Sequence, residues 1–148
     1  MSLKKRRTTI EVPSNLSYIK KVSTKIIRFL KNYNLSDVCL FNIRLCVEEA
    51  LRNAIEHGNE FNKSIPIKVS FCIDDYELEI SVEDRGKGFD FNSLPDPTTD
   101  ENIMLDRGRG VFLIRHLMDE VSFSDRGNRI TMKKKLNQGG FNARKSRK

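Results

Sequence analysis

The sequence lacks the features of a secreted, membrane-spanning or disulfide-stabilised protein. Its 148 residues contain only three cysteines, Cys39, Cys46 and Cys72, which are widely spaced and flanked by apolar residues. An odd number of such thiols is typical of buried, reduced cysteines rather than of a disulfide framework or a metal site. No secretory hydrophobic segment and no run of about eighteen apolar residues is present. We therefore expect a soluble, cytoplasmic protein with no membrane partner.

The chain also lacks an RNA-recognition signature, zinc-finger spacing and any basic run interleaved with aromatic residues. Its net charge is nevertheless +7, with a pI near 9.5, which suits nucleic acid, an anionic membrane surface or acidic proteins. The excess lies mainly near the ends, in residues 4–7, 133–135 and 144–148. Basic termini are usually solvated, so direct nucleic-acid binding stays a secondary hypothesis.

Neither an internal repeat nor a linker interrupts the chain, and its length is that of one domain. We expect one folded domain over residues 1–136, followed by a basic, disordered tail over residues 137–148. Alternating polar and apolar residues predict strands, and apolar residues at helical spacing predict helices. The predicted strands are 7–12, 67–73, 78–82 and two around 121–127 and 128–136. The predicted helices are 16–33, 37–56 and 110–121.

The sequence also predicts where several of these elements begin and end. Pro13 ends the first strand, Ser14 or Asn15 can cap the first helix, and Ser36 can cap the second. Gly58 is expected to take a left-handed turn after the second helix. Residues 89–104 form a long polar stretch of the kind that is usually functional. Helices on one face of a mixed, mostly antiparallel sheet give an α+β two-layer sandwich.

The most informative stretch is LCVEEALRNAIEHGN, residues 45–59. Residues four apart lie above one another on a helix, so Glu49 and Asn53 point the same way. An apolar stripe on another part of the helix anchors it to the core: Leu40, Ile43, Val47, Ala50, Leu51 and Ala54. A carboxamide oxygen suits a Mg²⁺ that already carries phosphate oxygens, and a carboxylate can accept a proton or orient a hydroxyl.

Two glycine clusters follow downstream, EDRGKGFD and DRGRGVFLIRHLMDE. Asp84 ends a predicted strand, where a carboxylate can accept a hydrogen bond or simply cap a turn. Gly86 and Gly88 would let the backbone approach a flat base closely. Residues 107–110 precede a predicted helix, so free N–H groups and the helix dipole are available to a phosphate. Arg107 and Arg109 can pair with phosphate or lie on a solvated face.

These three motifs, in this order, resemble the N-box, first glycine box and lid box of the GHKL ATPases, which share the Bergerat fold. Within that superfamily, the small size, the run GRGVFLIRHLMDEV and the basic last strand resemble the bacterial anti-sigma factor serine/threonine kinases most closely. The resemblance spans nearly the whole chain, from about residue 8 to residue 136. Its specificity rests on the combination, because each motif alone is weak.

The resemblance implies ATP and Mg²⁺ as cofactors and assigns roles to matching residues. Glu49 is implied as the general base or hydroxyl-orienting group and Asn53 as the Mg²⁺ ligand. Asp84 would take the adenine amino group beside Gly86 and Gly88. The lid box is implied at Gly108 and Gly110, with Arg107 or Arg109 touching the phosphates; the sequence leaves the choice between them open.

Several other polar residues are less suited to these roles or depart from the family pattern. Glu48 fits the catalytic position less well, because the spacing to Asn53 is wrong and Glu48 with Arg52 reads as an i,i+4 surface pair. His57 can face the phosphates or only complement the helix dipole, and His116 is expected to be structural. Asn128 departs from the threonine common in the family after the glycine of the last strand pair, which puts the detailed adenine contacts in doubt.

The implied function is an anti-sigma factor that binds a sigma factor and phosphorylates a small anti-anti-sigma protein. The resemblance also implies a homodimer. A second hypothesis is a nucleotide-binding module that sequesters its partner with little or no kinase activity. A third is a nucleic-acid-binding protein driven by the basic termini. A two-component histidine kinase is a poorer match, because no phosphoacceptor helical hairpin precedes the ATPase-like segment, and the gyrase, chaperone and mismatch-repair branches are larger.

Overall fold

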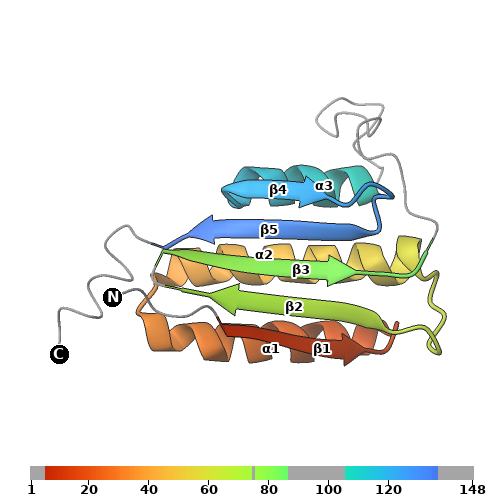
Figure 1. Cartoon of the computed structure of the whole chain (residues 1–148), viewed down its shortest axis with the longest axis horizontal. Helices are drawn as coiled ribbons and strands as arrows, with labels where there is room; N and C mark the ends of the chain where they lie inside the picture. Colours follow the sequence, from red (N-terminus) through yellow and green to blue (C-terminus); the bar gives the residue numbers. More distant parts are fainter. Residues whose placement is uncertain (1–5, 75, 87–105, 137–148) are drawn as a thin grey trace.

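The computed structural model describes residues 6–74, 76–86 and 106–136 (Figure 1). The strands are β1 Arg6–Val12, β2 Ile67–Ile73, β3 Glu77–Glu83, β4 Glu120–Phe123 and β5 Arg129–Lys135. The helices are α1 Ile19–Leu30, α2 Asp37–Asn53 and α3 Asp106–Leu117, with short helical turns η1 Leu16–Tyr18, η2 Lys31–Tyr33 and η3 Ala54–Gly58. Strand order is β1-β2-β3-β5-β4, and every neighbouring pair is antiparallel.

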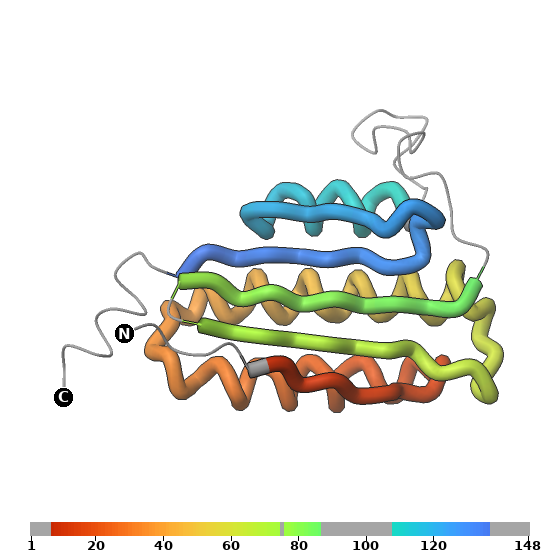
Figure 2. The backbone as a smooth tube through the Cα atoms, viewed as in Figure 1, coloured from red at the N-terminus to blue at the C-terminus, as the bar shows by residue number. Residues whose placement is uncertain are grey.

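The three helices lie side by side on one face of the sheet, with α2 between α1 and α3 (Figures 1 and 2). The predicted α+β two-layer sandwich is therefore confirmed. Period-two alternation explains it, because one set of strand residues is buried beneath the helices. The core between the layers includes fully buried residues from every helix and the central strands: Ile26, Leu30, Ile43, Leu51, Ile80, Ile114 and Met132.

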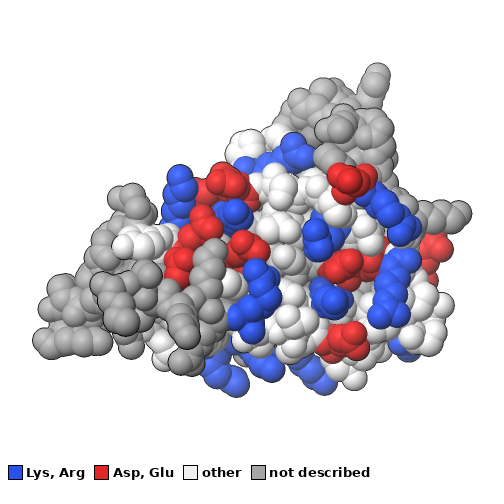
Figure 3. Space-filling view, viewed as in Figure 1, with Lys and Arg blue, Asp and Glu red and all other residues white. Residues whose placement is uncertain are grey.

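The other face of the sheet is polar and bears both signs of charge (Figure 3). A row of hydroxyl residues crosses all five strands in register: Thr9, Ser70, Ser81, Thr131 and Ser122. On one side of that row, Lys68 lies opposite Glu83, which in turn lies opposite Arg129. Opposite charges on facing strands stabilise a sheet modestly, so this face is close to electrically balanced.

The predicted caps of the first two helices are confirmed in outline. Asn15 accepts a hydrogen bond from the Ser17 N–H and begins η1, which leads into α1. Ser36 accepts from the Cys39 N–H at 3.0 Å and begins α2. Between the helices, Asn34 has a positive φ of 52°, the conformation that lets the chain reverse. The strands and hairpin from Ile67 to Glu83 also match the prediction closely.

The end of α2 differs from the prediction. The α-helix ends at Asn53 and continues as a π-helical turn over Ala54–Gly58, closed by the Asn59 N–H donating to the Ala54 carbonyl. Single π turns of this kind occur frequently at functional sites. Gly58 is not the left-handed residue that was expected, because the positive φ values fall at Glu60 (51°) and Phe61 (62°).

The third helix also differs from the prediction. It begins at Asp106, four residues before the expected Gly110, and it ends at Leu117 so that β4 can start at Glu120. The sequence GRG disfavours a helix by propensity alone, and the packing of this turn against α2 overrides that preference. The long stretch 89–104 and the tail 137–148 lie outside the described residues.

One buried amide ties four segments together at the end of α2. The Asn59 side chain is 5% exposed. Its Nδ2 donates to Ser14 Oγ and to the Ile65 carbonyl, and its Oδ1 accepts from the Arg85 N–H at 2.8 Å. Ser14, which was considered as a helix cap, instead donates to the same Ile65 carbonyl. The loop after α2 is therefore fixed to the ends of β1, β2 and β3.

The cysteines behave as expected from their apolar neighbours. All three are free thiols, and Cys46 and Cys72 are buried. Burial raises the pKa of Cys46 to about 12, so this thiol stays protonated at neutral pH and is a poor nucleophile. No helix within the described ranges combines the length and the apolar character needed to cross a bilayer.

Asn59→Ala should lower the free energy of unfolding by roughly 2–3 kcal/mol, because buried donors and acceptors on three segments would lose their hydrogen-bond partner. Asn32→Ala is the matched control, since Asn32 is exposed and donates only to the Phe29 carbonyl; its effect should stay within about 0.5 kcal/mol. Urea unfolding followed by circular dichroism measures both. Equal losses for the two variants would contradict the role given to Asn59.

Candidate nucleotide-binding site

Glu49 and Asn53 face α3 from the last turns of α2. A Cβ atom added at Gly110 would lie 2.9 Å from Glu49 Oε1 and 3.2 Å from Asn53 Nδ2. The helical spacing that predicted a shared direction for these two side chains is therefore confirmed. The glycine lets the first turns of α3 pack directly onto both polar groups. The structure thus brings together one carboxylate, one carboxamide and the lid-box backbone.

The partners of the two neighbouring glutamates correct one prediction. Glu48 does not pair with Arg52: Ser23 Oγ on α1 donates to Glu48 Oε2 at 2.6 Å, and Arg44 Nε lies 4.0 Å away. Arg52 instead lies beside Glu49, with Nε 3.8 Å from Oε2. The i,i+3 partner prevails because the Ser23 hydroxyl draws Glu48 toward α1. Glu48 is thus a link between helices, and Glu49 faces the site.

A second close approach joins the end of α2 to the end of β3. A Cβ atom at Gly58 would collide with the Asp84 carboxylate, and one at Gly86 would collide with the Gly58 carbonyl. Glycine is needed at both positions for lack of space, and Gly58 does not use its conformational freedom. The contact presses the Asp84 carboxylate, in a residue that is 4% exposed, against the helix end. Gly88 lies outside the described residues.

Asp84 is fixed by backbone and side-chain hydrogen bonds. Its Oδ1 accepts the Gly86 N–H at 2.8 Å in a local turn, as the turn-capping interpretation predicted. The Asp84 N–H donates to the Asn128 carbonyl, and Asn128 Nδ2 donates back to the Asp84 carbonyl, both at 2.9 Å. Asn128 also accepts from Ser124 Oγ. Asn128 therefore fixes the end of β3, a role that its position after Gly127 did not indicate.

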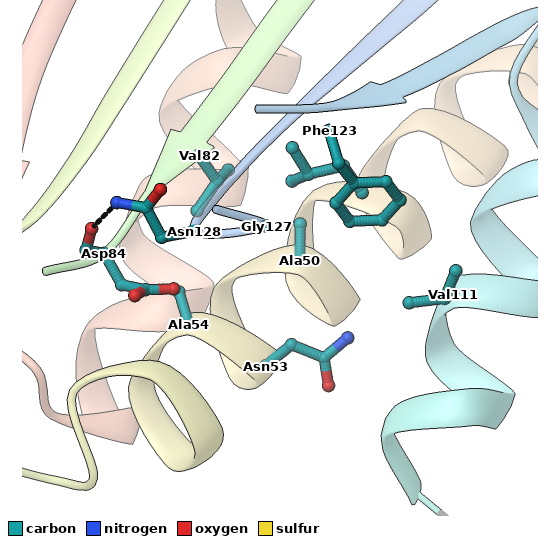
Figure 4. A pocket seen from close by; sticks show the side chains of 10 residues that line it. Ala50, Asn53, Ala54, Val82, Asp84, Val111, Phe123, Gly127 and Asn128 are labelled. Atoms are coloured by element: carbon teal, nitrogen blue, oxygen red, sulfur yellow. Dashed lines mark hydrogen bonds between the residues drawn. The ribbon is translucent and has the colours of Figure 1, made fainter. Parts of the chain in front are cut away.

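A pocket opens between α2, α3 and the ends of β3 and β5 (Figure 4). Its polar groups are Asp84, Asn53 and Asn128. Its apolar walls are Ala50, Ala54, Val82, Val111, Phe123 and Ile130. The empty volume is about 320 Å³ when the open mouth of the pocket is included. Apolar walls with one buried carboxylate suit an apolar group that carries a hydrogen-bond donor.

The walls of this pocket include residues that sequence reasoning missed. Val111 directly follows the lid-box glycine Gly110 in α3, and Phe123 ends β4, which carries no motif. Their apolar character alone does not distinguish a pocket wall from core packing. Arg52 was also missed as a neighbour of Glu49, because i,i+3 and i,i+4 partners compete and the sequence alone does not rank them.

The start of α3 remains suited to an anion although its residues are helical. Gly108 and Gly110 are buried in its first turns, and Arg109 is exposed. The first four N–H groups of an α-helix have no partner within the helix, and they lie at the positive end of its dipole. Phosphate oxygens are the ligands that such a terminus binds. Of the two candidate arginines, only the side chain of Arg109 is described.

His57 lies away from the pocket. It is exposed, its Nε2 is 4.0 Å from Glu56 Oε1, and it lines an outer crevice with Arg85, Gly86 and Arg126. His116 is exposed as well and stacks on Phe112 with ring centroids 4.4 Å apart. Neither imidazole joins the group formed by Glu49, Asn53 and Asp84.

The polar groups present fit Mg²⁺ better than a transition metal. Within the described ranges no three His, Cys, Asp or Glu side chains gather as a metal-binding cluster. Asn53 offers a neutral oxygen at the pocket (Figure 4). Mg²⁺ usually takes one or two protein oxygens and completes its shell with water and substrate phosphates. A single carboxamide beside a helix N-terminus agrees with that pattern.

Comparison with known proteins agrees with this geometry. The model of the histidine kinase-like ATPase domain matches residues 12–134. A serine-protein kinase RsbW from Listeria monocytogenes is 26% identical over 139 residues, which cover 89% of this chain and 88% of the relative. The Oceanobacillus iheyensis protein of the same name is 28% identical over 132 residues, 84% of each chain. That of Bacillus licheniformis is 32% identical over 106 residues, 66% of this chain and 65% of the relative.

These matches confirm the resemblance to the GHKL ATPases that the order of the three motifs indicated. The residues matched begin at the end of β1 and finish within β5, so they include Glu49, Asn53, Asp84 and the start of α3. The site and the fold that carries it therefore lie within one recognised domain. The chain belongs to the histidine kinase-like ATPase domain family.

Proposed function

We propose that the protein is an ATP-dependent serine/threonine kinase and anti-sigma factor, which binds a sigma factor and phosphorylates a small anti-anti-sigma protein. The observation that carries the proposal is the contact of the Gly110 backbone with Glu49 and Asn53. It joins a candidate base, a candidate metal ligand and a phosphate-binding helix terminus in one place. The name serine-protein kinase, borne by relatives that align over most of the chain, supports it further.

In this proposal the pocket selects adenine. The Asp84 carboxylate already accepts the Gly86 N–H through Oδ1, and a carboxylate has further lone pairs for an exocyclic amine. A guanine would present a carbonyl oxygen there, and two acceptors facing each other in a buried position are unfavourable. Ala50 and Ala54 line the pocket with small side chains, while Asn128 holds the strand end that carries Asp84.

Phosphoryl transfer needs mainly alignment and charge neutralisation. Asn53 would hold Mg²⁺ through its amide oxygen, and the ion, when bound, supplies positive charge at the phosphates. Glu49 orients the substrate hydroxyl and accepts its proton as the new bond from oxygen to the γ-phosphorus forms. The bond between the γ-phosphorus and the bridging oxygen breaks, and ADP leaves. Arg52 lies beside this carboxylate, with Nε 3.8 Å from Oε2.

The phosphate added to the anti-anti-sigma protein, here called the antagonist, would act electrostatically. A dianion placed in a protein interface opposes rebinding through desolvation and repulsion. The phosphorylated antagonist would thus dissociate from the kinase, and the kinase would bind the sigma factor again. We propose that the kinase acts as a homodimer, as the resemblance implies, and sedimentation or light scattering at working concentration tests this.

A sequestering module with weak or absent kinase activity is the alternative. Purified protein incubated with radiolabelled ATP, Mg²⁺ and the candidate anti-anti-sigma protein separates the two. Label transferred to the antagonist supports the kinase, whereas ATP binding by calorimetry with no transfer supports the module. A folded protein that gives no heat with ATP and Mg²⁺ contradicts both. Steep salt-dependent binding to duplex DNA would instead favour the nucleic-acid hypothesis.

Glu49→Gln should slow phosphoryl transfer by about 10²–10⁴-fold, the contribution typical of a positioned general base. ATP affinity should change little, because the amide keeps the size of the carboxylate. Glu48→Gln is the matched control: it lies one residue away, contacts Ser23 and Arg44, and should retain transfer. Initial rates at saturating ATP measure both. Similar losses in the two variants would refute the assignment of Glu49.

Gly110→Ala should weaken ATP binding by about tenfold or more, because its methyl group would push α3 away from Glu49 and Asn53. Calorimetric titration with ATP and Mg²⁺ measures the effect. In a Glu49→Ala background, the same substitution should do less harm, since the Oε1 atom nearest the new methyl is gone. A fully additive double mutant would show that the two residues do not interact.

A further inference from the structure

Two large apolar side chains are exposed near the start of α2. Val38 is 70% exposed and Phe41 is 61% exposed. A single exposed apolar residue needs no explanation, but two on one helical face, one turn apart, form a local apolar surface. Leu45, one turn further along, is half-buried. These three residues, called the α2 apolar patch below, lie on the side of α2 that faces away from the sheet.

The α2 apolar patch points along the helix toward Glu49. Val38 and Glu49 are eleven residues apart, which is three helical turns, so the two side chains lie on one line about 16 Å long. Leu45 falls between them on the same line, four residues before Glu49. The Glu49 side chain is itself 23% exposed. A protein seated on the patch would therefore extend over the catalytic carboxylate.

Helix α1, which packs beside α2, is basic, unlike the balanced open face of the sheet. Four cations and no anion are found in α1, and all four are exposed: Lys20, Lys21, Lys25 and Arg28. On α2 itself, Arg44 and Arg52 lie beside Glu48 and Glu49, so α2 adds no net positive charge. Because α1 packs beside α2, these cations lie on the helix that neighbours the patch. An apolar centre with a charged rim is the usual anatomy of a protein interface.

We propose that the α2 apolar patch is the docking surface for the phosphoacceptor protein, which would present an apolar helix or ridge flanked by acidic residues. The inference rests on the proposed kinase function and goes further by assigning the surface that delivers the substrate. Apolar contact at Val38 and Phe41 supplies affinity, and the basic rim of α1 selects an acidic partner. The line from Val38 to Glu49 then brings the substrate hydroxyl to the base.

The test is steady-state phosphorylation of the anti-anti-sigma protein by the full chain and by the double variant Val38→Ser/Phe41→Ser. We expect the KM for the protein substrate to rise about tenfold or more, as for loss of a binding hot spot. The KM for ATP should stay unchanged, since neither residue lines the nucleotide pocket. The KM for the substrate should also rise with salt, because the rim is charged.

Tyr76→Ser is the matched control, since Tyr76 is 63% exposed but lies at the turn between β2 and β3. It should leave both KM values unchanged. An unaltered substrate KM in the double variant, or an equal rise in Tyr76→Ser, overturns the docking surface while leaving the kinase intact. A double variant that loses only sigma-factor binding also overturns it. A wild-type chain that binds ATP but phosphorylates no antagonist rejects the proposed function itself.

Discussion

Gly58 and Gly86 meet at the ends of α2 and β3 with no space for a side chain at either position. This contact sets the distance between the helix layer and the sheet where the pocket opens. It also fixes where the Asp84 carboxylate lies, because that group is packed against Gly58. A shift of either segment would separate Asp84 from Asn53, and the pocket between them would lose its polar groups. The remaining features of the site depend on this one close approach.

The π turn and Asn59 maintain the same contact from behind. A π turn is intrinsically unfavourable, so tertiary contacts must hold it. Asn59 does so by bonding to segments that end β1, precede β2 and follow β3. On the opposite side, Gly110 allows α3 to rest on Glu49 and Asn53. The site is therefore assembled from three backbone approaches, each of which requires a small residue or a buried amide.

The periodicity of apolar residues predicted most of the helices and strands. The 3.6-residue repeat located α1 and α2 and placed Glu49 and Asn53 on one side of a helix, and strand alternation located the sheet. Periodicity could not show that α3 begins at Asp106, because two glycines in its first turns lower the local preference for a helix. Nor could it assign Glu48 and Glu49 to their partners, since that choice depends on Ser23, which is distant in sequence. Periodicity also could not explain Gly58: a left-handed turn was expected there, whereas glycine is required because a side chain would collide with Asp84.

The unequal charge of the two layers has a kinetic consequence. Within the described residues, the cations on α1 and the mixed charges on the open face of the sheet give the sandwich an electric dipole with its positive end at the helix layer. Such a dipole exerts a torque on an approaching acidic protein while the two are still separated by solvent. The partner would be oriented before contact, so a larger share of collisions would occur at the helix layer and lead to binding.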